Sequence, residues 1–222
     1  MLARALSLVF LLFIAPLALA ADINERVRPF DDGPKDASFL KFRNELKAII
    51  AAKDEAALMK IVDPKIQNGF GGEDGSAKFR SGWKLGDPKS EVWRALSLTI
   101  ELGGNFDNKT TFSAPYPYSA FPSDVDGFTT VVVTAEGAVM REQPKPDARV
   151  VRTLDHDILM YAAQPLGKLQ HEATEADWLE LKDAKGKHGF VRALDVRSPI
   201  DFRAIFEKKR GKWLMTAFLA GD

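Results

Sequence analysis

The sequence predicts an α+β fold in two parts: a helical N-terminal lobe completed by a C-terminal β-hairpin, and a small β-barrel inserted between them. Residues 37–101 carry apolar side chains at helical spacing, residues 130–191 form short apolar segments separated by turn residues, and residues 200–219 alternate with a period of two. Short strands bounded by turns are typical of an all-β barrel rather than of a βαβ unit.

The first 36 residues are predicted to precede the folded part. Arg4 is the only charged residue in 1–20, an apolar run follows it, and Ala18-Leu19-Ala20 fits cleavage by signal peptidase. The apolar run is too short to cross a bilayer as a helix. We therefore expect a signal peptide at 1–20, export to the periplasm and no stable membrane insertion. Residues 21–36 are charged and rich in turn residues, which predicts a flexible leader.

Composition excludes several classes of function. The chain has no cysteine, which rules out disulfides, cysteine nucleophiles, thiolate metal sites and a lipid anchor on cysteine. Its 31 basic and 31 acidic residues balance, so long-range attraction to a phosphate backbone is weak and no nucleic-acid partner is expected. The basic cluster Lys208-Lys209-Arg210 is interpreted as the solvated tip of a hairpin.

Four helices are predicted in the N-terminal lobe, which we place at 37–127. They begin at residues typical of helix starts, namely Asp36, Asp54, Gly75-Ser76 and Asp87. The second is expected to stop at Asp63-Pro64. The fourth is the clearest, because Pro88 takes the first helical position and Gly103-Gly104 lies beyond the end.

Residues 107–127 are predicted to link this lobe to the barrel. Prolines 115, 117 and 122 disfavour a regular helix and favour an extended, polyproline-II-like path. The segment is too aromatic for a free linker, so we expect it to pack. Tethered next to the barrel at an effective concentration of about millimolar order, it could cover or complete a groove there. Tyr116 and Tyr118 are therefore candidate ligand-binding residues.

The C-terminal residues 199–222 are predicted to form a β-hairpin. Residues 200–206 and 213–219 alternate with a period of two around a loop of about five residues. A lone hairpin is marginally stable in water, so this one must dock. We expect it to dock on the helical lobe, which lacks an obvious sheet of its own.

The order of residues at 128–198 resembles the bacterial SH3-like (SH3b) family. The matching features are Val139-Met140-Arg141 followed by Pro144, the apolar segment 150–154, Trp178-Leu179-Glu180-Leu181, and the closing Gly186-Lys187-His188-Gly189-Phe190-Val191. The resemblance implies an SH3-like barrel that recognises peptidoglycan peptides or serves as a targeting module beside a hydrolase.

Aromatic side chains are the candidate binding residues of this barrel. SH3-like barrels hold extended peptides in grooves lined by aromatic rings. Trp178, Phe190 and Tyr161 are candidates, although packing in the core is the more frequent role for the first two. The chain departs from the family in two ways. No cysteine-histidine hydrolase accompanies the barrel, and Asp195 stands where many relatives have an aromatic residue, so the usual ligand site could be altered or absent.

Glu73 is the best candidate for a catalytic acid. It lies beside Asp74 in a glycine-rich loop, and cell-wall glycosidases use pairs of acidic residues. Paired catalytic acids normally flank their substrate, however, so a turn next to a helix start explains these neighbours better. Among the scarce histidines, His171-Glu172 could supply two metal ligands at most. We therefore expect no metal and no cofactor.

These patterns together favour an exported, non-catalytic protein. Its barrel would recognise a cell-wall or periplasmic peptide or another envelope protein. One alternative is a cell-wall hydrolase or lyase in which Glu73 is the acid and the barrel recruits substrate. The other is a barrel that serves as a structural module without its own ligand.

Overall fold

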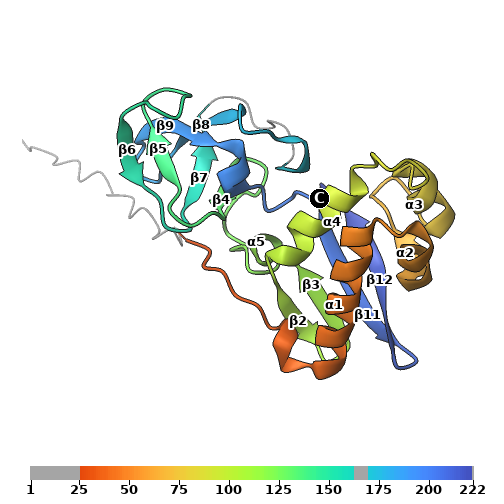
Figure 1. The fold of residues 1–222 in the computed structure, drawn as a ribbon. Coiled ribbons are helices and arrows are strands. Elements are labelled where there is room, and N and C mark those ends of the chain that lie inside the picture. The colour runs from red at the N-terminus through yellow and green to blue at the C-terminus, as the bar shows by residue number, and fades with distance from the viewer. Residues whose placement is uncertain (1–25, 163–169, 222) are drawn as a thin grey trace, which may run out of the picture.

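The computed structural model describes residues 26–162 and 170–221, so the predicted signal peptide lies outside the described residues. The chain forms two lobes, each built around its own β-sheet (Figure 1). The mixed α+β class is confirmed. None of the helices in the described ranges is both long and apolar enough to span a membrane.

The first lobe contains a five-stranded sheet in the order β1-β12-β11-β3-β2. The bounds are β1 Val62–Gln67, β2 Asn105–Asn108, β3 Thr111–Ala114, β11 Arg203–Lys209 and β12 Lys212–Leu219. The predicted hairpin is therefore present as β11 and β12, and it forms the centre of the sheet. The expectation that the helical region has no sheet was wrong, because β1, β2 and β3 come from it. Proline 64 is tolerated in β1 because this strand lies at an edge.

The hairpin turn is tighter than predicted. Lys209 pairs with Lys212, which leaves only Arg210 and Gly211 between the strands. Both have positive φ, 50° and 81°, as a two-residue hairpin turn of the primed type requires. The basic tip is exposed at Lys209 and Arg210, as expected. Lys208 is partly buried, and its Nζ atom donates to Ser38 Oγ on the neighbouring helix at 2.8 Å.

Five helices belong to this lobe and its junction: α1 Ala37–Ala52, α2 Glu55–Ile61, α3 Ser76–Gly82, α4 Val92–Glu101 and α5 Tyr116–Ser119. The predicted caps of α1 and α2 are confirmed, since Asp36 accepts from the Phe39 amide and Asp54 from the Ala57 amide, each at 2.9 Å. The start of α4 was predicted wrongly. Asp87 closes a separate turn by accepting from the amide of Ser90, and the helix begins at Val92.

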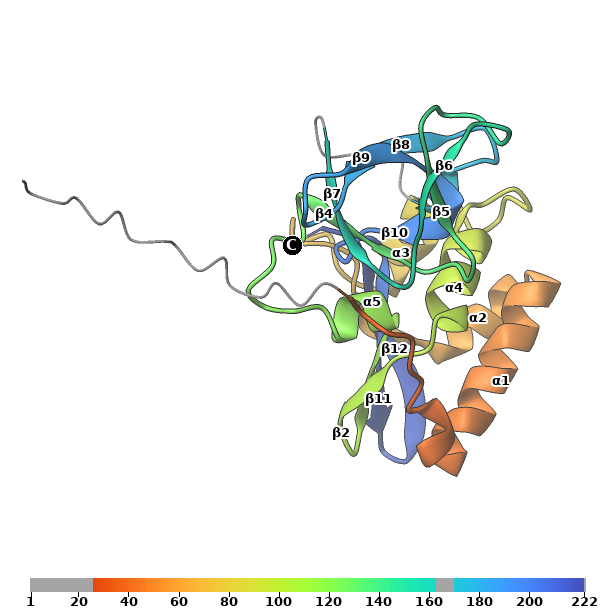
Figure 2. The ribbon, with the colours of Figure 1, turned by 90° about the vertical axis from the view of Figure 1, so that its left-hand side faces the viewer.

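An aromatic core fills the space between the helices and the sheet. Phe39, near the start of α1, is completely buried and lies at the centre of this core. Its ring centroid is 4.1 Å from that of Phe112 on β3 and 5.0 Å from that of Trp213 on β12. The helices α1 and α4 lie on the same side of the sheet in both ribbon views (Figures 1 and 2).

The second lobe is one curved, antiparallel sheet in the order β10-β4-β7-β8-β9-β5-β6. Its strands are β4 Thr130–Val133, β5 Val139–Arg141, β6 Val150–Thr153, β7 Ile158–Tyr161, β8 Trp178–Lys182, β9 His188–Arg192 and β10 Val196–Arg197. Figure 2 shows these strands curling round one another. The predicted barrel is not closed. In the described part, the edge strand β6 pairs only with β5 and the other edge strand, the two-residue β10, pairs only with β4.

The segment between the lobes does not take the predicted polyproline-II path. Its first part forms β3, whose ladder with β11 pairs Phe112 with Phe206. The short helix α5 follows, with Pro117 in its first turn. A proline is tolerated there because the first amides of a helix have no intrahelical partner.

The described part of the predicted leader is packed rather than flexible. Val27 is 4% exposed, and its amide donates to the carbonyl of His156 on the curved-sheet lobe at 3.0 Å. The Asp32 amide donates to the Gly104 carbonyl on the helical lobe at 2.8 Å. Residues 26–36 therefore run along both lobes (Figure 2).

Candidate functional site

The predicted site residues do not meet in one cavity. Glu73 lies in an exposed loop of the helical lobe, where its carboxylate is 3.5 Å from Lys78 Nζ. Its side chain is 79% exposed, and its main-chain carbonyl accepts from the Asn68 amide group. The loop has the geometry of a turn before α3, which was the simpler of the two interpretations. In the described part of the chain, Glu73 is not placed opposite a second acid across a cavity, as the paired acids of glycosidases are.

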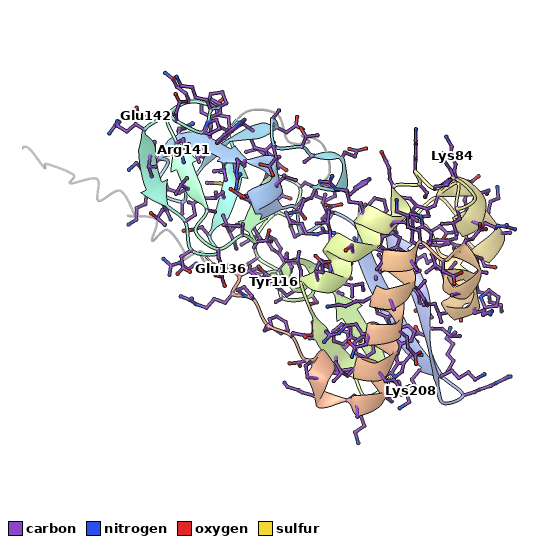
Figure 3. The ribbon with its side chains drawn as sticks, viewed as in Figure 1. Lys84, Tyr116, Glu136, Arg141, Glu142 and Lys208 are labelled. Atoms are coloured by element: carbon purple, nitrogen blue, oxygen red, sulfur yellow. The ribbon has the colours of Figure 1, made fainter. Side chains whose placement is uncertain are left out.

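Tyr116 is a core residue at the junction of the lobes (Figure 3). It is 1% exposed and packs with Val27, Val132 and Ile158. Its hydroxyl has no hydrogen-bond partner among the residues that the structure describes, and burial raises the pKa of this hydroxyl to about 12. The segment carrying Tyr116 thus packs on the curved-sheet lobe, as expected, but this ring is not available to a ligand.

Tyr118 is partly buried and contacts a different part of the molecule. The Arg203 guanidinium lies 4.7 Å from the centroid of the Tyr118 ring and 5.4 Å from that of the Phe70 ring. Cation–π attraction of this kind stabilises the stack. The guanidinium also donates to the carbonyl of Gly221. Tyr118 therefore helps to hold the C-terminal end of the chain.

Tyr161 and Phe190 lie on the curved sheet and are both partly buried. Tyr161, on β7, packs against the apolar core of its lobe. Burial, and after it the charge of Asp201, raises the pKa of Tyr161 to about 12. Phe190, on β9, is paired with Glu180 on one side and with Arg141 on the other. Neither Tyr161 nor Phe190 lines the groove beside Trp178 that is described next.

Trp178 lies at the start of β8 and lines a groove of about 230 Å³ on the curved sheet. The other lining residues are Gly137, Val139, Arg141, Pro146, Arg192 and Asp195. Figure 3 labels Arg141 on the side of this lobe that faces away from the helices. Trp178 is only partly buried and does not belong to the core of its lobe, which consists of aliphatic side chains. We call this hollow the Trp178 groove.

Hydrogen bonds of charged side chains hold the residues of the Trp178 groove in place. Asp195 is 7% exposed and accepts two hydrogen bonds from Arg192, at 3.0 and 3.1 Å. The hydrogen bond and charge of Asp195 raise the pKa of Arg192. Arg141 donates to the carbonyl of Ala148 at 2.7 Å and so holds the loop that carries Pro146. An indole, a proline and two guanidinium groups thus line one surface, which suits an extended peptide that carries a carboxylate.

Asp195 stands where the resemblance to the SH3b family led us to expect an aromatic residue. Its carbonyl accepts from the amides of Thr134 and Ala135, and its carboxylate orients Arg192. An aromatic side chain at this position could not orient Arg192. The groove contains this arginine–aspartate pair beside Trp178.

A second hollow, of about 600 Å³, lies between the lobes. It is lined by the end of α1, the start of α4 and the short turn η2, Gln170–Glu172. Glu91, His171 and Glu172 each offer a ligand atom there, and these atoms lie within 4.8 Å of one another. The sequence suggested only His171-Glu172, because Glu91 is distant in the chain and no local pattern joins it to them. We call this hollow the interlobe cleft.

No family model matches the chain, and no curated protein and no solved structure shows significant similarity to it. The function is therefore inferred from the Trp178 groove and the interlobe cleft.

Proposed function

We propose that this is an exported, non-catalytic binding protein that holds an extended peptide in the Trp178 groove of an SH3b-like module. The observation that carries the proposal is the position of Trp178. Its lobe has an aliphatic core from which this ring is missing, and the ring instead lines a groove beside Pro146. Large aromatic rings on open grooves are frequent anchors for peptides.

Arg141 is the cation of the groove that favours a carboxylate-bearing ligand. Its residue lines the groove, and its guanidinium donates to the Ala148 carbonyl. The carboxylates of Asp195 and Glu175 pair with Arg192, so they offset its charge and fix its orientation. Peptides of the bacterial cell wall are short and rich in carboxylates, and the signal-like N-terminus is consistent with that compartment. We therefore infer a periplasmic peptide or an envelope protein as the partner.

The exposed setting of Glu73 favours binding over hydrolysis. This carboxylate is solvated and paired with Lys78, and it does not line either of the two hollows. The hydrolase alternative predicts that Glu73→Gln abolishes the release of muropeptides from purified cell-wall sacculi. We expect neither the unchanged protein nor the variant to release them.

The test of the proposal is a binding measurement with Trp178→Ala. Purified protein is titrated with synthetic stem peptides of the cell wall, and binding to sacculi is followed by sedimentation. Loss of an aromatic anchor should weaken binding by about 30-fold or more. Phe128→Ala is the matched control, because Phe128 is an aromatic of the same lobe, 50% exposed and outside the groove.

Three outcomes separate the candidate functions. Binding that is lost in Trp178→Ala and kept in Phe128→Ala supports the proposal, provided that circular dichroism shows both variants folded. Equal binding by the unchanged protein and Trp178→Ala refutes the groove as the site. No binding of any peptide or sacculus refutes it as well and leaves the curved sheet as a structural module.

A further inference from the structure

Three potential metal ligands from distant parts of the chain meet in the interlobe cleft. Glu91 immediately precedes α4, whereas His171 and Glu172 lie in the η2 turn, which follows β7 in the chain. The His171 Nε2 atom is 3.8 Å from Glu91 Oε2, and all three ligand atoms lie within 4.8 Å of one another. The cluster combines one imidazole with two carboxylates, which are ligand types that Zn²⁺ accepts.

The histidine of this cluster is held in place by its surroundings. His171 is 8% exposed, and its ring meets those of Phe202 and Trp83 edge to face, with centroids 5.2 and 6.3 Å away. Arg94 on α4 donates to the Ala173 carbonyl at 2.8 Å, which ties the η2 turn to the same helix that Glu91 precedes. This direct contact between the lobes therefore keeps the imidazole of His171 close to Glu91.

Two buried nitrogens of residues that line the cleft, His171 Nδ1 and Trp93 Nε1, have no hydrogen-bond partner among the described residues. Trp93 is 4% exposed. Buried polar groups are nearly always paired in folded proteins. An indole N–H can only donate, so a water or an anion held beside a metal ion, rather than the ion itself, would pair with it. This observation is independent of the carboxylates.

We propose that Glu91, His171 and Glu172 bind a zinc ion that joins the two lobes. Ligand atoms around a tetrahedral zinc are about 3.3 Å apart. The separations in the cleft can contract to this value, because Glu91 has a 66% exposed side chain that can rotate. Two carboxylates balance the charge of the ion. Three protein ligands leave the fourth position for water or for an anionic group in the cleft, which Lys53 and Lys89 also line.

The site does not depend on the proposed peptide function, since it shares no lining residue with the Trp178 groove. His171 and Glu172 supply two ligands, as expected from the sequence, and Glu91 adds one that the sequence did not suggest. The third ligand comes from the other lobe and is brought near only by the packing of η2 on α4.

Metal binding is tested on untagged, purified protein stripped with chelator. Zn²⁺ is titrated in by calorimetry, and Co²⁺ is used as a spectroscopic substitute whose visible absorption reports tetrahedral coordination. We expect one ion per chain. Removal of an outer-shell partner typically weakens metal binding 10- to 100-fold, so the loss of a direct ligand in Glu91→Gln or His171→Ala should weaken it by about 100-fold or more.

The matched control is His188→Ala, which removes an exposed histidine of the curved-sheet lobe that does not line the cleft. Zinc should raise the melting temperature of the unchanged protein and of this control, but not that of Glu91→Gln. Glu91 is exposed, so its variant should remain folded even where His171→Ala does not. Absence of zinc binding by the unchanged protein, or equal binding by Glu91→Gln, would overturn the proposal.

Discussion

The two lobes place their aromatic residues differently. In the helical lobe, the rings of Phe39, Phe112, Phe206 and Trp213 lie in the centre of the core. The core of the curved-sheet lobe consists of aliphatic side chains such as Leu159 and Leu181, and its rings lie at or near the surface. An aromatic ring buries a large apolar area, so rings kept out of a core are available for binding. This difference is why we assign recognition to the curved sheet.

The curved sheet has a smaller core than the helical lobe, and ion pairs near its turns add to its stability. Arg152 on β6 contacts both Asp157 and Asp183, two residues that are 5% and 6% exposed. Asp183 also accepts from the amides of Lys185 and Lys187 and thereby closes the turn before β9. Charge-assisted bonds of this kind are about twice as strong as neutral ones. Part of the order in this lobe therefore comes from polar contacts.

A buried polar network joins the lobes. Arg197, at the end of β10, is 2% exposed and donates to Gln170 in η2 and to Thr99 in α4. It also donates to the Phe202 carbonyl at 2.6 Å and lies 3.8 Å from Asp201. Burial lowers the pKa of Arg197 against the opposing effect of Asp201. The guanidinium thus contacts both lobes and the turn that carries His171.

The largest expected effect comes from removing an aromatic ring of the helical core. Phe39→Ala should lower the free energy of unfolding by about 3–5 kcal/mol, because Phe39 is fully buried among other rings. Leu159→Ala in the aliphatic core removes fewer atoms and should cost about 2–3 kcal/mol. Urea denaturation followed by circular dichroism measures both. Equal or reversed costs would contradict the contrast between the two cores.

Arg197→Met tests whether the buried network couples the lobes. The substitution leaves the carboxylate of Asp201 buried without its cation, so we expect a loss of about 3 kcal/mol. We also expect unfolding to separate into two transitions, one for each lobe. Arg149→Met, which breaks an exposed pair with Glu142, is the control and should change stability little. A single unshifted transition in Arg197→Met would show that the lobes are held together by other contacts.

The smallest expected effect is the pH dependence of the stability that Asp183 contributes to the curved sheet. Burial acts to raise the pKa of Asp183, but hydrogen bonds from the Lys187 amide and Arg152 outweigh it, and the pKa is lowered. The stability that this carboxylate contributes is therefore fully present above its unfolded pKa of about 3.9 and is lost as the pH falls through the lower native pKa.

Asp183→Asn should accordingly destabilise the protein by about 1.5–3 kcal/mol at neutral pH, the range for hydrogen bonds to charged groups. The difference from the unchanged protein should shrink as the pH falls below about 4. Urea denaturation between neutral pH and pH 3 measures it. A difference that stays constant over this range would show that the charge of Asp183 contributes nothing.

Local patterns in the sequence determined the elements with short-range causes. The caps at Asp36 and Asp54 follow from a side chain that reaches an amide three residues later. The short apolar segments between 130 and 191 form strands, as expected, because turn residues separate them. Gly189, by contrast, is required by a tertiary contact with β5. A Cβ atom there would lie 2.3 Å from the Met140 side chain and 2.8 Å from the Arg141 carbonyl.

Only the tertiary structure decided which distant residues meet. The strands β1, β2 and β3 carry no strong period of their own. They exist because β1 pairs with β12, β3 with β11, and β2 with β3. Tyr116 was expected in a groove but is buried, because α5 packs between the lobes. Glu91 reaches His171 only through the packing of η2 on α4. Contacts of this kind depend on how surfaces fit after folding, and no spacing along the chain encodes them.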